Sequence, residues 1–467
     1  MIRTGETACA PATGGGGAIA IIRISGTESL SICSRIFYPL DNSIKLSDQK
    51  GFTVVLGEIR STDEVIDEVL LTVFRAPHSY TGENSVEISC HASQYIIRKI
   101  LELLISHGAV SAKPGEFTQR AFFNGKMDLS QAEAVADVIA SKTSSSHKIA
   151  LNQMRGGFSA EIKSLRHELL NFASLIELEL DFGEEDVEFA DRKDLKAIIT
   201  RVRELADKLV NSFRLGNALK NGVPVAIIGK PNSGKSTLLN ALLMEERALV
   251  SEIPGTTRDS IEDTIVIDGI EYRFIDTAGL RETSDIIEIM GIKKTHEKID
   301  QASVILLIDE ITDSAESINK RVQAIREMIG GSEKRLIILI NKIDTASEDK
   351  QVELKRKIIL EEKDALLFIS AKEKSGLDVL RNRLSDIIVK EKLSSDDVII
   401  TNLRHYEAMF CVSESLGRVM SGLEDKIPED LIAIDIRQAI HYLGEITGEI
   451  TSDEILGNIF RNFCIGK

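Results

Sequence analysis

Residues 229–236 read GKPNSGKS, and this stretch decides the fold of the segment around it. It matches the pattern GxxxxGK[ST], follows an apolar run at residues 225–228 and precedes a helical pattern at residues 237–243. In such a loop the glycines let backbone N–H groups cradle phosphate oxygens, and the N-terminus of the following helix adds a favourable field. We expect Lys235 to reach the β- and γ-phosphates of a nucleotide and Ser236 to ligate Mg²⁺.

Four motifs downstream follow in the order of a guanine-nucleotide site. PGTTRD at residues 254–259 supplies a switch threonine, and DTAG at residues 276–279 follows a strand pattern. Asp276 is then expected near the Mg²⁺ shell and the Gly279 N–H near the γ-phosphate. NKID at residues 341–344 and SAK at residues 370–372 each follow an apolar strand. The nucleotide-binding residues predicted from these motifs are Asn232, Ser233, Gly234, Lys235, Ser236, Thr237, Thr256, Thr257, Asp276, Thr277, Ala278, Gly279, Asn341, Lys342, Asp344, Ser370, Ala371 and Lys372.

The nucleotide that the motifs predict is GTP rather than ATP. The Asp344 carboxylate can accept hydrogen bonds from the guanine N1–H and exocyclic amine, while Asn341 and Lys342 frame the base. Adenine lacks this pair of donors, and a site whose buried polar groups are left unpaired discriminates strongly.

The position after DTAG is Leu280, where small GTPases carry a glutamine that orients the attacking water. Leucine cannot orient water, so another group must do so. The charged residues of the following loop are candidates, although any one of them could equally be a solvated loop charge. These candidates are Arg281, Glu282, Asp285 and Glu288.

Composition narrows the class of protein. A chain of 467 residues is too long for one compact core, which indicates two or three domains. We expect no membrane span and no signal peptide, because no apolar run approaches the ~20 residues a bilayer requires. The five cysteines are scattered and form no CxxC pair, which suits a cytoplasmic protein without a zinc site. The net charge of −16 disfavours non-specific binding to polyanions, but a local basic patch or a partner could still serve an RNA substrate.

Hydrophobic periodicity divides the chain into three kinds of segment. The first part reads as α+β, with strand patterns at residues 18–22, 69–74 and 86–88. Residues 129–215 and the segment after about residue 380 are helical, and strands alternate with helices between them. We predict a multidomain fold of α+β and α/β class, with an all-helical domain interrupted by a Ras-like P-loop GTPase domain. The predicted domains are residues 1–124 (N-terminal α+β), 125–218 (helical, first part), 219–382 (GTPase) and 383–467 (helical, second part).

Several segments beyond the nucleotide motifs resemble one known family, that of the tRNA-modification GTPase MnmE, also called TrmE. They are AIAIIRISG at residues 18–26, PGEFT at 114–118, DLSQAEA at 128–134, LGEITG at 443–448 and FCIGK at 463–467. The terminal Cys-x-Gly-Lys would by itself be read as a frayed tail. In combination with the other segments it is the most distinctive part of the resemblance.

The resemblance implies a homodimer that works with a flavin-dependent partner protein, MnmG (GidA). Together such proteins add a carboxymethylaminomethyl-type group to C5 of the wobble uridine of certain tRNAs. The one-carbon donor is a folate, 5-formyl- or methylene-tetrahydrofolate, bound by an N-terminal domain that also forms the dimer. GTP hydrolysis is potassium-stimulated in this family, with the ion taking the place of an arginine finger.

Site residues are carried over by position from the same resemblance. Glu288 matches the glutamate that orients the attacking water, and Lys235 acts on the phosphates. Thr257 and Ser236 are implied to hold magnesium. The implied potassium ligands are Asn232, Ser251, Ile253 and Thr256, and Ser251 thereby joins the nucleotide site. The implied folate-binding residues are Arg23, Glu87, Lys126 and Lys467.

Cys464 has two readings that the sequence leaves open. It could be a nucleophile near the one-carbon unit if neighbouring cations lower the pKa of its thiol, or a small apolar residue that packs the tail. The chain also departs from the family in the N-terminal domain. Residues 14–17 are four glycines where the family has a Pro-Pro-Gly turn, and residues 92–94 read ASQ where the family has glycines. Both departures weaken the folate prediction.

Two other classes of protein share parts of the pattern. A ribosome-assembly-type GTPase switch also has Leu280 and Asn232, but it would not need the N-terminal domain or the Cys-x-Gly-Lys tail. A membrane-remodelling GTPase would use the helices as a stalk, but the sequence has no basic amphipathic face or lipid anchor.

Overall fold

The computed structural model describes residues 5–14, 16–62, 64–181, 192–247, 263–275, 296–330, 334–389, 398–425, 427–461, 463 and 465–466. The chain forms two compact units. Unit 1 comprises Met1–Ile139, Ala150–Ala206 and Ala408–Lys467, and unit 2 comprises Ala140–Ile149 and Asp207–Glu407. Of the described helices, none is long and apolar enough to cross a membrane.

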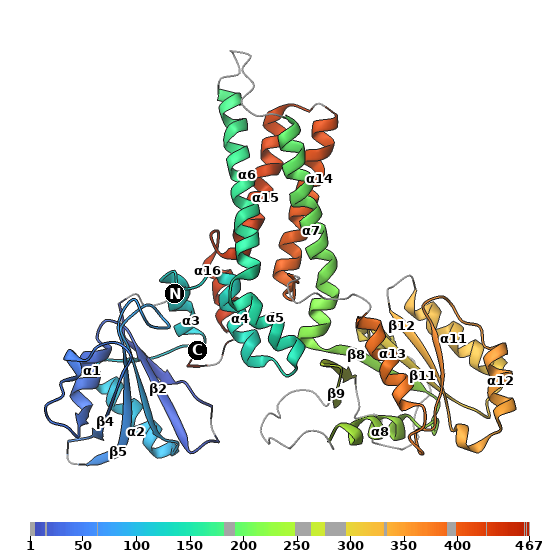
Figure 1. The fold of residues 1–467 in the computed structure, drawn as a ribbon, viewed down its shortest axis with the longest axis horizontal. Coiled ribbons are helices and arrows are strands. Elements are labelled where there is room, and N and C mark those ends of the chain that lie inside the picture. Colours follow the sequence, from blue (N-terminus) through green and yellow to red (C-terminus); the bar gives the residue numbers. More distant parts are fainter. Residues whose placement is uncertain are drawn as a thin grey trace. The chain divides into compact units, whose positions relative to one another are not determined.

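The N-terminal part of unit 1 is a seven-stranded sheet in the order β3-β4-β5-β6-β2-β1-β7 (Figure 1). Its strands are β1 (Ala8–Pro11), β2 (Ile19–Ser25), β3 (Phe37–Pro39), β4 (Thr53–Arg60), β5 (Val65–Phe74), β6 (Ser85–His91) and β7 (Val110–Ser111). All neighbours are antiparallel except β1 and β7, which are parallel. Strands were predicted at β2, β5 and β6, and the predicted α+β class of this part is confirmed.

Helices cover one face of this sheet, because buried apolar side chains alternate along its strands with side chains that point to the other face. In β2, Ala20, Ile22 and Ile24 are buried in a core that also holds residues of α1 (Ser29–Ile36) and α2 (Gln94–Ser106). The intervening side chains point to the opposite face, where Arg23 of β2 lies opposite Glu87 of β6. A short helix, η1 (Leu46–Asp48), and α3 (Glu116–Phe123) complete this part of the chain.

The rest of unit 1 is helical. The helices are α4 (Leu129–Ala140), α5 (Ser144–Met154), α6 (Gly157–Asp181), α7 (Arg192–Asn221), α14 (Leu403–Glu424), α15 (Glu429–Thr447) and α16 (Asp453–Arg461), and some extend into unit 2. Helices α6 and α15 lie side by side (Figure 1). Helical spacing in α6 predicts an apolar stripe that includes Ile162, Leu169 and Ile176, and all three are buried. Helical spacing in α7 predicts an apolar stripe of Leu195, Ile198, Val202, Leu205 and Leu209. Leu195, Val202 and Leu209 are buried as predicted, whereas Ile199 and Ala206 are buried in place of their neighbours Ile198 and Leu205.

Unit 2 is built on a six-stranded sheet in the order β13-β12-β11-β8-β10-β9. The strands are β8 (Val223–Gly229), β9 (Asp263–Ile267), β10 (Ile270–Phe274), β11 (Val304–Glu310), β12 (Arg335–Asn341) and β13 (Ala365–Phe368). Only the β9–β10 pair is antiparallel, and Asp268 and Gly269 form its turn with positive φ of 51° and 79°, as the Asp-Gly pair predicts. The predicted P-loop α/β class is confirmed.

Helices cover both faces of this sheet. Helices α8 (Lys235–Arg247) and α13 (Leu377–Val389) pack on one face. Helices α11 (Ala315–Ile329) and α12 (Glu348–Lys357) pack on the other. The predicted domain limits at residues 218 and 382 fall inside α7 and α13, because Leu219 and Leu384 belong to the same core as the sheet.

Candidate functional site

The loop between β8 and α8 holds the predicted phosphate cradle. Gly229 ends β8, and a Cβ at this position would lie 2.3 Å from the backbone oxygen of Ile308 on β11. Gly234 has φ of 99°, and a Cβ there would lie 2.2 Å from Nδ2 of Asn341. Only glycine fits both positions, so the loop lies close against the strands and its backbone lines the cradle directly.

Lys235 begins α8 and folds over the loop. Its Nζ donates to the backbone oxygens of Gly229, at 2.9 Å, and of Lys230, at 2.5 Å. Burial lowers the pKa of Lys235, and the nearby Lys298 lowers it further. A partly desolvated ammonium at the N-terminus of a helix is suited to pair with phosphate oxygens.

Asn341 connects two parts of the predicted site. Its side chain is buried, with Nδ2 donating to the Ser233 carbonyl at 2.8 Å and Oδ1 accepting from the Ala371 N–H at 3.0 Å. The first contact is with the phosphate loop and the second with the SAK loop. Asn341 therefore holds the two loops together, which explains why an asparagine with one donor and one acceptor group is needed here.

Asp344 and Lys342 lie beside this bridge. The Asp344 carboxylate is exposed and accepts a hydrogen bond from the Ser370 hydroxyl at 2.5 Å, and this bond is the main reason why the pKa of Asp344 is lowered. Lys342 has φ of 64°, and its ammonium pairs with Glu310 at 2.6 Å. The Asp344 carboxylate is thus ionised and open to a donor from outside the chain, as the guanine prediction requires.

Several predicted site residues lie outside the described residues, so the structure does not place them. They are Ser251, Ile253, Thr256, Thr257, Asp276, Thr277, Ala278, Gly279, Glu288, Cys464 and Lys467. Their predicted roles remain predictions.

A chain of ion pairs near the cradle was not predicted. Lys230 of the loop pairs with Asp313 at 2.7 Å, and Arg321 of α11 pairs with Asp313 at 2.9 Å and with Asp309 at 2.8 Å. Asp309 ends the apolar part of β11 and is fully buried. Burial raises the pKa of the Asp309 carboxyl, while Arg321 acts to lower it. An acidic residue directly after a buried strand was the available signal in the sequence.

The seven-stranded sheet carries a second polar site. Arg23 pairs with Glu87 on the neighbouring strand, with Nε and Nη2 at 2.9 and 2.8 Å from Glu87 Oε1. The guanidinium lies over the rings of Tyr80 and Phe117, at 5.1 and 5.6 Å from their centroids. Its Nη1 donates to the backbone oxygen of Gly466 at 3.4 Å. The structure therefore brings two of the predicted folate residues together and adds the C-terminal tail to them.

The tail is closely packed where it meets the sheet. A Cβ at Gly466, whose φ is 96°, would lie 2.0 Å from the backbone oxygen of Pro11 at the end of β1. At Gly115, with φ of 68°, a Cβ would lie 2.8 Å from the backbone oxygen of Phe460 in α16. Glycine at these two positions lets the end of the chain approach β1 and α3.

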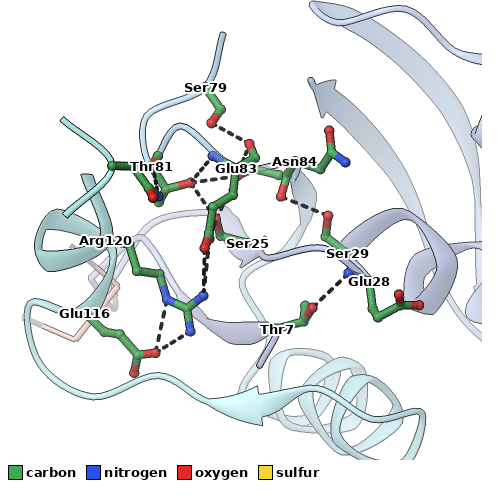
Figure 2. A network of polar contacts seen from close by, with 12 residues as sticks. Thr7, Ser25, Glu28, Ser29, Ser79, Thr81, Glu83, Asn84, Glu116 and Arg120 are labelled. Atoms are coloured by element: carbon green, nitrogen blue, oxygen red, sulfur yellow. Dashed lines mark hydrogen bonds and ion pairs between the residues drawn. The ribbon is translucent and has the colours of Figure 1, made fainter. Parts of the chain in front are cut away.

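A polar network supports the loop that carries Tyr80 (Figure 2). The buried Arg120 of α3 pairs with Glu116 at 2.7 Å and with Glu83 at 3.2 Å. Glu83 also accepts a hydrogen bond from Ser25 of β2 at 2.7 Å. The loop between β5 and β6 is thus attached to both β2 and α3, and the predicted folate residue Lys126 donates to its Pro77 carbonyl at 3.0 Å.

Comparison with known proteins identifies both parts of the chain. The MnmE helical domain matches residues 129–464, and the N-terminus of the GTP-binding protein TrmE matches residues 7–126. The tRNA modification GTPase MnmE of Bacteroides thetaiotaomicron is 52% identical over 464 residues, which cover 99% of each chain. The protein of the same name from Flavobacterium johnsoniae is 52% identical over 455 residues, which cover 97% of each chain. The chain therefore belongs to the MnmE family of tRNA modification GTPases.

Proposed function

We propose that this chain hydrolyses GTP to drive the modification of C5 of the wobble uridine in certain tRNAs. The observation that carries the nucleotide part is the Asn341 bridge, which sets the phosphate loop beside the open Asp344 carboxylate. The phosphate loop is suited to bind phosphates, and the Asp344 carboxylate is suited to bind guanine. The Asn341 side chain holds the phosphate loop against the SAK loop, whose Ser370 contacts Asp344. Membership of the MnmE family supports tRNA as the molecule that is modified.

The glycines of the phosphate loop leave room for a bound nucleotide, which supports the proposal. Gly229 and Gly234 leave a cradle that a Cβ would fill. Ser236, in the first turn of α8, and Thr257 would hold magnesium, which neutralises charge on the β- and γ-phosphates when bound. Lys235 would bind the same phosphates, and Glu288 would position the attacking water in place of the glutamine that Leu280 replaces.

Potassium is proposed to stimulate the hydrolysis. Asn232 has φ of 63° in the phosphate loop, and it would hold the ion together with groups of Ser251, Ile253 and Thr256. A monovalent cation there supplies charge that an arginine finger would otherwise supply. Turnover in KCl should greatly exceed turnover in NaCl at equal ionic strength, and equal rates in the two salts would exclude this part of the proposal.

The seven-stranded sheet is proposed to bind the folate donor. The Glu87 carboxylate can accept hydrogen bonds from a pterin, while Arg23, Lys126 and Lys467 can pair with the glutamate tail of 5-formyl- or methylene-tetrahydrofolate. The pairing of Arg23 with Glu87 and its contact with Gly466 support this assignment, because they hold the guanidinium in one place. Cys464, two residues before Gly466 in the sequence, is proposed to lie near the same site.

A second copy of the chain is proposed to cover the outer face of this sheet. Val54 and Leu56 of β4 and Leu70 of β5 are 44–60% exposed there, and Leu56 lies directly opposite Leu70. An apolar patch of neighbouring strands favours association with an equally apolar surface.

The proposed function also includes MnmG as the flavin-dependent partner protein and the cytoplasm as the compartment.

Nucleoside analysis of tRNA tests the proposed function. Cells that lack this protein should lose the wobble-uridine side chain, and the wild-type gene should restore it. A Lys235→Ala variant should fail to restore it, because the ammonium no longer binds the phosphates. Unchanged wobble nucleosides in the deletion strain would favour the ribosome-assembly type of GTPase switch instead.

A further inference from the structure

Unit 2 contains a cavity of about 410 Å³ at the N-terminal ends of its strands, whereas the nucleotide loops follow their C-terminal ends. It is lined by the first residues of β8, β11 and β12, including Val223, Val304 and Arg335. The loops predicted to bind GTP follow the other ends of the same strands. The C-terminal turn of α7 and Ile387 of α13 complete its wall. The cavity is therefore separate from the nucleotide site.

The lining is strongly basic. Arg214, Arg273, Lys334 and Arg335 line the cavity, and Asp300 is the acidic residue among its lining residues. This local excess of positive charge contrasts with the net charge of −16 of the chain. Cations gathered in a concave surface focus the local field and attract an anion.

Arg335 is the residue that the fold itself does not explain. Its Nε is buried and makes no hydrogen bond with any described residue. A buried donor without an acceptor is unfavourable, and native structures almost always satisfy such groups. A guanidinium presents its donors in a fork that matches two phosphate oxygens. An anion in the cavity would therefore satisfy Arg335.

The neighbouring Lys334, in contrast, has hydrogen-bond acceptors within the chain. Its ammonium donates to the backbone oxygens of Ile299, and of Asp300 at 2.7 Å. A lysine that contacts the last carbonyls of a helix stabilises that end of the helix. These acceptors are neutral, so Lys334 still contributes its positive charge to the cavity. The buried Nε of Arg335 has no such acceptor among the described residues.

We propose that this basic cavity binds a backbone phosphate of the tRNA. The proposal rests on the proposed function, which makes tRNA the molecule that is modified. An acidic chain needs a local basic site to hold a polyanion, and contacts to phosphates position a nucleic acid without reading its sequence. Arg335 makes the charge-assisted contact, and Arg214, Arg273 and Lys334 supply the surrounding field.

Equilibrium binding of tRNA to the full-length protein at several KCl concentrations tests the proposal. Arg335→Gln should weaken binding about tenfold, the scale of one charge-assisted hydrogen bond. It should also reduce the slope of log affinity against log salt by about one, as expected for one lost phosphate contact. The matched control is Arg356→Gln, which removes the same charge from an exposed position on α12 and should leave both values unchanged.

A second variant and a competition experiment decide whether the cavity binds tRNA. Arg335→Lys keeps the charge and should retain the salt slope, so it keeps the test informative if Arg335→Gln does not fold. Displacement of tRNA by millimolar inorganic phosphate from the wild-type protein, but not from Arg335→Gln, supports the proposal. Arg335-dependent binding of phosphate that leaves tRNA binding unchanged would assign the cavity to free anions and overturn it. Equal tRNA affinity of Arg335→Gln and Arg356→Gln would also overturn it.

The failure of this inference can be told from failure of the proposed function. If the wild-type gene restores the wobble nucleoside and Arg335→Gln binds tRNA normally, the inference is wrong and the function stands. If the wild-type gene does not restore the nucleoside, the proposed function is wrong whatever the tRNA affinity of the variants.

Discussion

The six-stranded and seven-stranded sheets gather their functional groups over very different distances along the chain. In the six-stranded sheet, the groups predicted to bind GTP come from short loops that directly follow single strands. In the seven-stranded sheet, Arg23 meets Glu87 across two paired strands and meets the Gly466 carbonyl over a separation of 443 residues. The first site is encoded as local motifs, and the second exists only once distant segments have packed together.

The largest expected effect separates these two sites. Deletion of residues 464–467 should abolish tRNA modification, because it removes the part of the site that arrives from the far end of the chain. GTP hydrolysis should stay intact, since none of the residues predicted to bind GTP belongs to the tail. Nucleoside analysis and phosphate release measure the two activities.

The substitution Cys464→Ser then tests the chemistry of the tail without removing it. Lost modification with intact folate binding would support a nucleophilic thiol. Retained modification would leave Cys464 as a packing residue. Loss of GTP hydrolysis in the deletion would contradict the separation of the two sites.

The second prediction concerns a catalytic group outside the nucleotide motifs. Glu288→Ala should lower GTP turnover ~100-fold or more, the scale of removing a general base, because Leu280 cannot orient water. GTP affinity should barely change, since the carboxylate acts on water. Single-turnover hydrolysis and nucleotide titration give both values.

Glu282→Ala is the control, as it removes the same charge from the same loop. Equal turnover of the two variants would mean that Glu288 has no special role. Loss of GTP binding by Glu288→Ala would point to a role in folding instead.

The third prediction concerns the ion pairs beside the phosphate loop. Arg321→Gln leaves the buried Asp309 carboxylate without its partner and should lower the free energy of unfolding by about 3 kcal/mol at pH 7. Burial raises the pKa of Asp309 in the folded chain, and loss of Arg321 raises it further. The folded state then binds a proton more readily than the unfolded state. The deficit relative to wild type should therefore shrink as the pH falls to about 5.

Thermal unfolding at the two pH values measures this effect. The double variant Asp309→Asn with Arg321→Gln has no carboxylate at this position and should lose the pH dependence of the deficit. A deficit of the same size at both pH values would show that the charge of Asp309 is not its cause.

The smallest expected effect lies in the segment at residues 140–149, which packs with unit 2. Lys142 pairs with Glu271 of β10 at 3.2 Å, but its side chain is 68% exposed. An exposed ion pair contributes little, so Lys142→Ala should lower the free energy of unfolding by about 0.5 kcal/mol. Lys148→Ala, an exposed lysine in the same segment, should have a smaller effect, and equal losses would mean that the pair with Glu271 does not stabilise the segment.

Sequence patterns predicted the six-stranded sheet well because its strands are continuous apolar runs followed by motifs. The apolar run at residues 304–308 predicts a strand and forms β11, and the run at residues 336–340 predicts the strand that forms β12. The short strands β1, β3 and β7 of the other sheet were not predicted, because strands of two to four residues are too short to show a period. The eight-residue β4 was also missed, because its apolar residues Val54, Val55 and Leu56 follow one another and hide the alternation between the two faces. Their pairing depends on partners far away in the sequence.

The helical segments show a different limit. The apolar stripe of α7 continues past residue 218, so periodicity cannot tell which of two cores each turn of the helix enters. The network of Asp309, Asp313 and Arg321 was missed for a similar reason. Each of these charges looks solvated in the sequence, and only the packing of α11 against β11 brings them together.

The close contact of Gly466 with Pro11 has a consequence for the order in which the protein is made. Residue 11 leaves the ribosome among the first, and the residue that completes its surroundings is added hundreds of residues later. The seven-stranded sheet can pair its strands early, because those strands end at residue 111. Its polar site is finished only after synthesis has passed residue 466, so a truncated chain carries the sheet without a complete site.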